Sequence, residues 1–252
     1  MVMKVDLNSD MGEGFGPWRM GDDAALLDVI TSANIACGFH AGDPDVMAET
    51  MRLAAKNGVG IGAHPGFADL KGFGRRRLNI GADELGNMIA YQLGAAEGVA
   101  RSVGANIRHF KLHGALANMC AEDATLAKTC YSAALRVNPE IILMVLAETA
   151  QQAVVQELGA NWAGEIFADR AYEDDATLVD RSKAGAVLHD ADMAAERILN
   201  MLREDAIIAE SGKRIPAKID TICLHGDTPE AVEMARALRT KLSAAGVTLT
   251  QF

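Results

Sequence analysis

The segment Asp6-Leu-Asn-Ser-Asp-Met-Gly-Glu-Gly14 places three carboxylates and two glycines at the end of a short apolar run. From Met3 to Asp10, Val5 and Leu7 alternate with polar residues, which is the pattern of a β-strand with its polar side chains on one face. Burying carboxylates on such a face costs free energy unless they have partners or a function. The segment therefore predicts a strand that ends in an active site, although Asp residues that cap a turn would give a similar composition.

The same arrangement recurs along the chain, where apolar or small-residue runs stop at polar, glycine-containing turns and are followed by helical patterns. Alternating strands and helices form βα units, which require a parallel sheet covered by helices. The fold class is therefore α/β, a (β/α) barrel that is seven-stranded and irregular, with its site at the carboxyl ends of the strands. An open parallel sheet would place the site in the same position. The seven strands are expected to begin near Met3, Ser32, Val59, Ile107, Ile141, Glu165 and Lys218.

Helical periodicity fills the intervals between these strands. Asp43 is expected to cap a helix that has Pro44 in its first turn and ends at Gly58. Further helices are predicted over 22–31, 83–104, 123–137, 149–158, 190–210 and 229–245.

Length, composition and charge restrict the kinds of protein that this chain can be. The chain has 252 residues, half of them hydrophobic, and no linker-like segment, so we expect a single domain over 1–252. A net charge of −10 argues against nucleic acid or an anionic membrane as a partner. With no signal peptide or long apolar span, a cytoplasmic location is expected. Four cysteines without a CxxC pair indicate buried thiols rather than disulfides. The P-loop, GxGxxG and GxSxG motifs are all missing from the sequence.

Lys111 is the most informative candidate for chemistry. On a strand, His109, Lys111 and His113 share one face. A buried lysine needs an anionic neighbour, and with Asp6, Asp10 or Asp169 on an adjacent strand Lys111 could hold an anionic substrate group or a developing oxyanion. A purely structural Lys–Asp pair inside the barrel is the alternative.

Four of the six histidines follow predicted strands: His40, His64, His113 and His225. Imidazole is both a frequent metal ligand and the usual acid/base at neutral pH. The spacing leaves both roles open. A metal site would combine Asp10 with two of these histidines, whereas a capping or core histidine is the plain alternative for each one singly.

Two loops could contribute further groups. The segment Gly72-Phe-Gly-Arg-Arg76 could fold over the site and supply guanidinium groups to a carboxylate or phosphate, although an exposed basic turn explains it almost as well. The polar segment 169–181 follows a strand, where function often lies but where flexible surface is the default.

These residues together resemble the LamB/YcsF family over nearly the whole chain. The resemblance implies a barrel similar to the glycoside hydrolase/deacetylase barrels. It also implies ATP-dependent opening of the small lactam 5-oxoproline to glutamate together with two partner subunits. Some positions depart from the usual family pattern without removing a charged or histidine motif residue: Ser9 for Cys, Phe67-Ala68 for Tyr-Pro, Leu112 for Pro, Ala117 for Tyr and Ala176 for Gly. The resemblance is carried by 6–13, 32–44, 62–65, 72–76, 111–115, 167–170 and 225–227.

Both lines of reasoning define one set of candidate residues. ATP is expected as a co-substrate that the partner subunits handle, because this chain has no nucleotide motif, and the presence of a divalent metal stays open. The rival interpretations are a stand-alone, metal-dependent amide hydrolase of the deacetylase kind and a non-catalytic substrate-binding subunit. The candidate catalytic residues are Asp10, Glu13, His40, His64, Lys111, His113 and Asp169. The candidate substrate-binding residues are Asp6, Asn8, Asn34, Arg75, Arg76, Arg170, His225 and Asp227.

Overall fold

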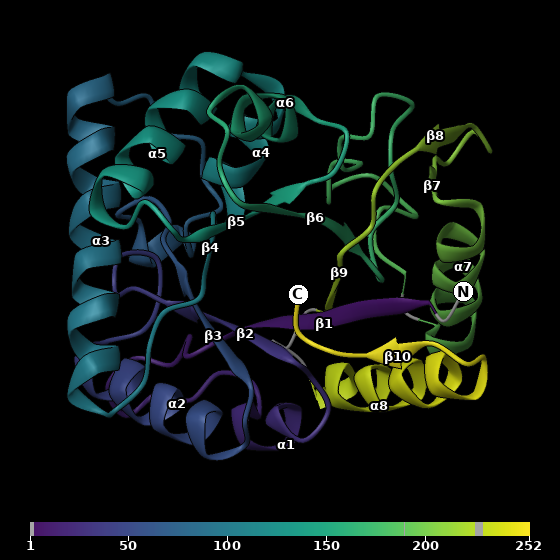
Figure 1. Cartoon of the computed structure of the whole chain (residues 1–252), viewed down its shortest axis with the longest axis horizontal. Helices are drawn as coiled ribbons and strands as arrows, with labels where there is room; N and C mark the ends of the chain where they lie inside the picture. Colours follow the sequence, from purple (N-terminus) through teal and green to yellow (C-terminus); the bar gives the residue numbers. More distant parts are fainter. Residues whose placement is uncertain (1–2, 189, 225–228) are drawn as a thin grey trace.

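A ring of parallel strands forms the centre of the computed structural model, which describes residues 3–188, 190–224 and 229–252 (Figure 1). In the described part of the chain seven strands pair in order, and the last pairs with the first, so the barrel is closed as predicted. For example, Asn8 lies beside Ser32 on one neighbouring strand and Cys223 on the other. The ring consists of β1 (Lys4–Met11), β2 (Ser32–Ala36), β3 (Gly60–His64), β4 (His109–Lys111), β5 (Ile142–Leu146), β6 (Trp162–Phe167) and β9 (Thr221–Leu224).

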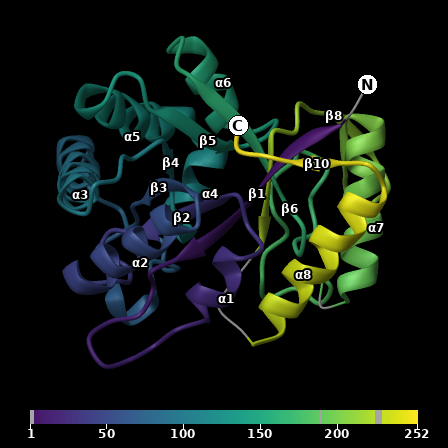
Figure 2. The same ribbon diagram turned by 60° about the horizontal axis from the view of Figure 1, so that its bottom comes forward.

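The helices lie outside this ring in both views of the ribbon (Figures 1 and 2). A short 3-10 helix, η1 (Leu70–Gly72), follows β3. The chain also has β10 (Thr248–Leu249), parallel to β1, and an antiparallel pair, β7 (Ala206–Ile208) and β8 (Arg214–Pro216). The helices are α1 (Asp23–Leu27), α2 (Pro44–Lys56), α3 (Ala82–Ser102), α4 (Gly114–Glu122), α5 (Ala124–Val137), α6 (Ala150–Glu157), α7 (Ala191–Glu204) and α8 (Pro229–Ala244).

Several predicted bounds were wrong. The helix predicted over 190–210 ends at Glu204, because Asp205 adopts a left-handed conformation with φ 46° and β7 follows it. The helix predicted over 22–31 is the short α1, which ends at Leu27. Helix α4 was not predicted, and β6 begins at Trp162, three residues before the predicted start.

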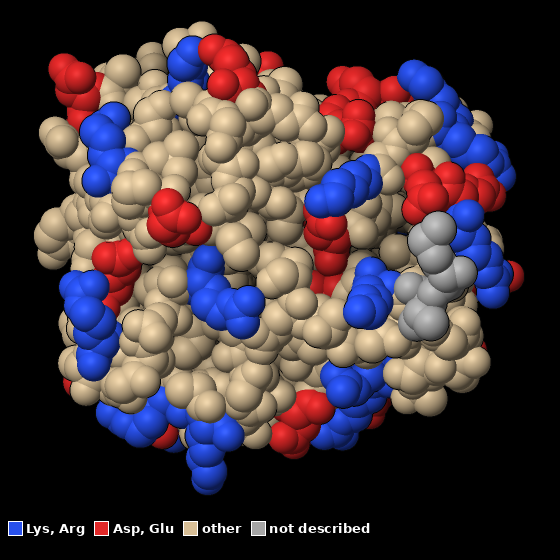
Figure 3. Space-filling view, in the orientation of Figure 1, with Lys and Arg blue, Asp and Glu red and all other residues tan. Residues whose placement is uncertain are grey.

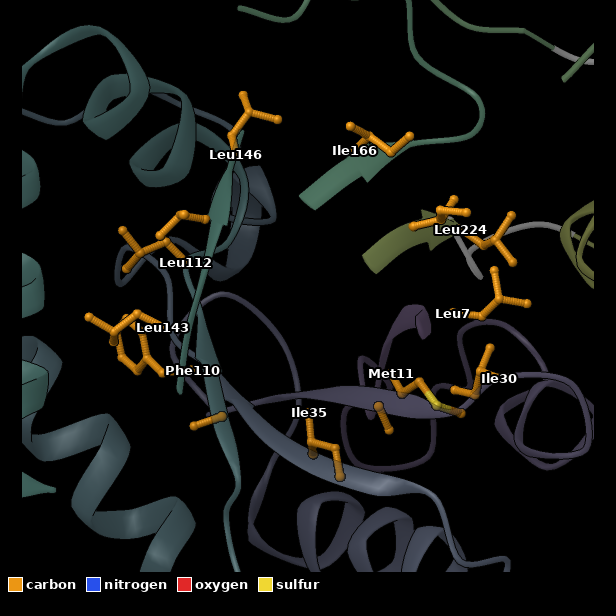
Figure 4. Close-up of a cluster of buried hydrophobic side chains, with 14 of the residues drawn as sticks. Leu7, Met11, Ile30, Ile35, Phe110, Leu112, Leu143, Leu146, Ile166 and Leu224 are labelled. Carbon is orange, nitrogen blue, oxygen red and sulfur yellow. The ribbon is translucent and has the colours of Figure 1, made fainter. Parts of the chain in front are cut away.

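The apolar core lies between the strands and the helices. Leu7, Phe110 and Ile166 point outward from their strands and are fully buried against the helical layer (Figure 4). The alternate residues point into the barrel, and for β1 these are the polar Asp6 and Asn8, as the sequence pattern predicted. The burial of these apolar side chains is the main contribution to the stability of such a fold. Polar side chains inside the barrel are therefore available for chemistry.

The amino-terminal mouth of the barrel is covered by the end of the chain. The ring of Phe252 lies 5.6 Å from that of His109, and Arg108 donates a hydrogen bond to the Phe252 carbonyl. In Figure 1 the C terminus accordingly lies over the middle of the strand ring. The carboxyl ends of the strands meet at the opposite mouth.

Charged side chains are mixed on the surface, and the cysteines are reduced. On the face shown in Figure 3, Lys and Arg side chains are scattered among acidic and neutral residues. Among the described residues, no helix combines the length and apolar character that crossing a membrane requires. All four cysteines are buried free thiols, as predicted.

Candidate active site

A cavity of about 540 Å³ opens at the carboxyl ends of the strands. Its volume is typical of a small-molecule site. It contains five of the seven candidate catalytic residues, together with Arg75 and Arg170 from the loops above the barrel. The five are Asp10, Glu13, His64, Lys111 and His113.

Lys111 lies at the floor of this cavity between two carboxylates. Its Nζ atom is 3.0 Å from Asp10 Oδ1 and 2.8 Å from Glu165 Oε1, and the residue is only 4% exposed. Burial alone would lower the pKa of Lys111, but the negative charges around it, Asp10 first, raise that pKa well above its usual range. Lys111 is therefore an ammonium ion held in place by two strands, and it in turn fixes Asp10.

Asp10 is the carboxylate that reaches the cavity from β1. Asn34 donates a hydrogen bond of 2.9 Å to Asp10 Oδ1, and Asp10 Oδ2 lies 3.3 Å from His64 Nε2. A carboxylate with one oxygen held by donors and the other beside an imidazole can orient and deprotonate a water molecule. Asp10 is thus placed for general-base chemistry.

His64 and His113 face each other across the cavity floor. His64 Nδ1 lies 2.9 Å from the Lys111 carbonyl, and His113 Nε2 lies 2.8 Å from the Phe73 carbonyl. Since a carbonyl can only accept, we assign a proton to each of these two nitrogens. The remaining nitrogens, His64 Nε2 and His113 Nδ1, are 3.0 Å apart. Burial, with a contribution from His64, lowers the pKa of His113 to about 3, so the ring is neutral near pH 7.

His40 completes a cluster of three imidazoles. Its ring stacks on that of His113, with centroids 3.7 Å apart and planes 7° from parallel. Burial, followed by the neighbouring His113 and His64, lowers the pKa of His40 well below its usual value. One donor atom from each of His40, His64, His113 and Glu13 lies within 4.8 Å of the others, an arrangement that could hold a metal ion.

The loop around Gly74 folds over this cluster, as the sequence suggested. A Cβ atom on Gly74 would lie 2.7 Å from His40 Cβ and 2.8 Å from His113 Cδ2, and Gly74 has a φ of 62°. Only glycine fits a backbone that passes this close in this conformation. The same loop places the Arg75 guanidinium over the Phe73 ring and on the cavity wall.

Arg76 does not share this position. Its guanidinium binds the buried carboxylate of Asp69, and its side chain is 63% exposed. Arg76 is absent from the cavity wall, so the substrate contact predicted for it is replaced by a structural ion pair. The structure thus separates the two adjacent arginines, Arg75 toward the site and Arg76 toward the loop.

Three predicted substrate-binding residues lie beneath the cavity rather than on its wall. Asp6 accepts hydrogen bonds from the hydroxyl groups of Thr31, Ser32 and Thr221, and burial raises its pKa. Asn34 donates to Asn8 Oδ1 as well as to Asp10. These residues form a polar layer that supports Asp10 and Lys111, which corrects their predicted role.

The loop after β6 is packed rather than free. Arg170, 4% exposed, donates hydrogen bonds to the carbonyls of Val179 and Ala186, and burial lowers its pKa to about 10. The loop thereby brings Val179 and Arg181 to the cavity wall. Asp169 is buried at the base of this loop and is not on the wall. His225 and Asp227 lie outside the described residues.

Glu165 is the site residue that the sequence interpretation missed. The predicted strand began at this position, so the face that Glu165 shares with Ala163 was not visible. Once β6 begins at Trp162, the parity of Glu165 places it inside the barrel beside Lys111.

Comparisons with known proteins agree with this architecture. The family model described as "LamB/YcsF family" matches residues 5–252. A protein of Ruegeria pomeroyi that is named as a 5-oxoprolinase subunit is 64% identical, covering 100% of this chain and 99% of its own. A protein of the same name from Rhodopseudomonas palustris is 53% identical, with 99% of each chain covered.

Solved structures show the same relationship at the level of the fold. The lactam utilization protein from Thermus thermophilus superposes with a TM-score of 0.93 at 38% identity, covering 99% of this chain and 100% of that one. A family 4 carbohydrate esterase from Streptomyces lividans has a TM-score of 0.52 at 11% identity, covering 98% and 91% of the two chains, and shows a likeness of fold alone. The chain therefore belongs to the LamB/YcsF family.

Proposed function

We propose that this chain is the ring-opening subunit of an ATP-dependent 5-oxoprolinase, which converts 5-oxoproline to L-glutamate together with two partner subunits. The observation that carries the proposal is the pairing of full-length similarity to proteins named as 5-oxoprolinase subunits with a polar cavity built around Asp10, Lys111 and His113.

The chemistry explains why ATP is needed. An unstrained lactam is a poor electrophile, and phosphorylation of its amide oxygen makes the ring carbon electrophilic. Attack of water at that carbon, cleavage of the ring C–N bond and hydrolytic release of phosphate then give glutamate. Because this chain has no recognisable nucleotide motif, the partner subunits perform the activation and this subunit performs the hydrolysis.

The position of each residue suggests its role in the ring-opening reaction. Asp10, or His113 next to it, takes the proton of the attacking water. Arg75 and Arg170 on the cavity wall hold the substrate carboxylate or phosphate, which suits the fixed geometry of a guanidinium. Lys111 holds the Asp10 carboxylate in place and stabilises negative charge that develops on the oxygen bound to the reacting carbon. His40 and His64 position these groups or deliver a proton to the leaving amine, whereas Asp169, which is not on the cavity wall, acts only by positioning them.

Asp10→Asn tests the assignment, because it keeps the shape of the side chain and removes the base. In the reconstituted three-subunit enzyme, we expect turnover to fall by about 10²-fold or more while the complex still assembles. Asp83→Asn, an equivalent change on the exposed first turn of α3, serves as the matched control and is expected to leave turnover unchanged. If D10N retains full turnover in an assembled complex, Asp10 is not the base of the reaction.

A stand-alone metal-dependent hydrolase is the second candidate, favoured by the histidine cluster and the deacetylase-like fold. That function predicts amide hydrolysis by the isolated chain without ATP. The proposed function predicts none under those conditions.

A further inference from the structure

We propose that Glu13, His40, His64 and His113 form a binding site for one divalent cation of the zinc type. The inference stands on the geometry of these four side chains and does not depend on the lactam reaction. Each residue comes from a different carboxyl-end segment: Glu13 follows β1, His40 follows β2, His64 ends β3 and His113 follows β4.

His40 gives the first argument. It is 1% exposed, and neither of its ring nitrogens has a hydrogen-bond partner among the described residues. A buried imidazole without a partner is costly, since its polar atoms have lost water and gained nothing. A metal ion at the centre of the cluster would supply the missing partner to one of these nitrogens.

The tautomers of the other two histidines give a second, independent argument. The Lys111 carbonyl accepts a hydrogen bond from one ring nitrogen of His64, and the Phe73 carbonyl accepts one from a ring nitrogen of His113. The second nitrogen of each ring therefore carries a lone pair, and these two lone pairs face each other at 3.0 Å. Two neutral acceptors at this distance repel unless a proton or a cation lies between them.

The distances fit a cation. Nitrogen ligands lie about 2.0–2.1 Å from zinc, so two ligands at tetrahedral or octahedral angles are roughly 3.0–3.4 Å apart. The separation of 3.0 Å between His64 Nε2 and His113 Nδ1 meets this condition. The hydrogen bonds from the other ring nitrogens to backbone carbonyls are the contacts that commonly orient metal-binding histidines.

Ligand type decides which cation fits. Three imidazoles and one carboxylate suit zinc and neighbouring transition metals, whereas Mg²⁺ and Ca²⁺ prefer a shell of oxygen atoms. Glu13 Oε1 lies 4.0 Å from His113 Nδ1, so the carboxylate is close enough to complete the set with a small side-chain adjustment. The second carboxylate, Asp10, borders the cluster through His64 and supplies further negative charge.

Calorimetric titration of the chelator-treated chain with zinc chloride, together with metal analysis by mass spectrometry, tests the inference. We expect one equivalent of zinc per chain and no competition from an excess of Mg²⁺. His40→Phe keeps the stacked ring and removes its nitrogens, and Glu13→Gln keeps the side-chain shape. Both variants should bind zinc at least about tenfold more weakly.

His109→Gln is the matched control, because His109 is a buried barrel histidine outside the cluster and its hydrogen bond to Asn34 can be kept by the glutamine amide. This variant should bind zinc as the wild type does. Circular dichroism establishes that each protein compared is folded. The inference is overturned if the folded wild-type chain shows no saturable zinc binding, or if H40F binds zinc as tightly as wild type.

Discussion

Lys111 Nζ lies 2.8 Å from Glu165 Oε1 inside the barrel, while Asp10 occupies its other side at 3.0 Å. The buried ammonium group of Lys111 thus forms ion pairs with two carboxylates that come from two different strands. Removing the charge of Lys111 would leave the two carboxylates inside the barrel without compensation. Since the three residues come from different strands, the position of Asp10, the candidate base, depends on the closure of the barrel.

Substitutions at Lys111 and Glu165 should therefore differ in cost. Lys111→Met leaves two carboxylates without a cation and should lower the free energy of unfolding by about 3–5 kcal/mol. Glu165→Gln leaves Lys111 paired with Asp10 and should cost only about 1–3 kcal/mol. Urea denaturation of both variants and of the double variant checks this, and the double variant should cost less than the sum of the two. Strictly additive costs would show that the pair is not coupled.

The close approach of Gly74 to the histidines yields a test of site geometry. Gly74→Ala would force its Cβ into His40 and His113, so turnover should fall by about 10²-fold. Gly58 is the matched control, because its φ of 68° imposes the same backbone strain but nothing lies within 4 Å of an added Cβ. Both variants should lose about 1–2 kcal/mol of stability from that strain. Gly58→Ala should keep full turnover in a reconstituted assay, and equal losses of turnover in the two variants would contradict the argument.

Asp43 connects the loop that carries His40 to the segment after Glu13. Its carboxylate caps α2 by accepting hydrogen bonds from the amides of Asp45 and Val46, and it also accepts one from Gly16. These amides, Val46 first, lower the pKa of Asp43 below the ordinary value of 3.8. A lowered folded-state pKa means that the stabilisation is fully present above pH 3.8 and is lost as the pH falls through the folded-state value.

Asp43→Ala should therefore cost about 1 kcal/mol at neutral pH, and the deficit relative to wild type should shrink in acid. Asp43→Asn keeps a good capping side chain that does not titrate, so its advantage over D43A should persist in acid. Urea denaturation at about pH 3 and pH 7 compares the three proteins. A deficit of D43A that does not change with pH would contradict the assigned hydrogen bonds.

Asp205 ends α7 in a left-handed conformation at an exposed position. Asp205→Gly should raise the free energy of unfolding by about 0.5–1 kcal/mol, since glycine adopts this conformation without a steric cost. Asp205→Ala should lower it by about 1 kcal/mol, because alanine tolerates the conformation less well than aspartate. Thermal unfolding of the two variants should therefore shift in opposite directions, and a shift in the same direction would refute the conformational explanation.

The barrel could be predicted because its strands end in recognisable polar turns. The pattern of Val5 and Leu7 against Asp6 and Asn8 gave the correct inward and outward faces of β1. What could not be predicted were features set by local backbone conformation, such as the left-handed Asp205, which stops a helix whose apolar spacing continues. Ala176, which stands where the family usually has glycine, likewise has a positive φ of 67° that no periodicity reveals.

Several residues named from the sequence line one cavity in the structure, but their arrangement could not be predicted. Strand parity left the anionic neighbour of Lys111 open among Asp6, Asp10 and Asp169, and the structure places Asp10 there. The sequence also could not separate wall residues from the supporting layer of Asp6, Asn8 and Asn34. Depth along a strand depends on register between neighbours, and register is a property of the assembled barrel. For the same reason, the sequence could not predict that Arg75 lies on the cavity wall and Arg76 does not, since the two arginines are neighbours in one loop.

Glutamate release from 5-oxoproline and ATP tests the central claim most directly. The assay compares this chain alone, the two partner subunits alone, and all three together. Turnover only with all three proteins is the predicted result. Conversion of 5-oxoproline by the partners without this chain, or by this chain alone, would contradict the division of labour between activation and ring opening.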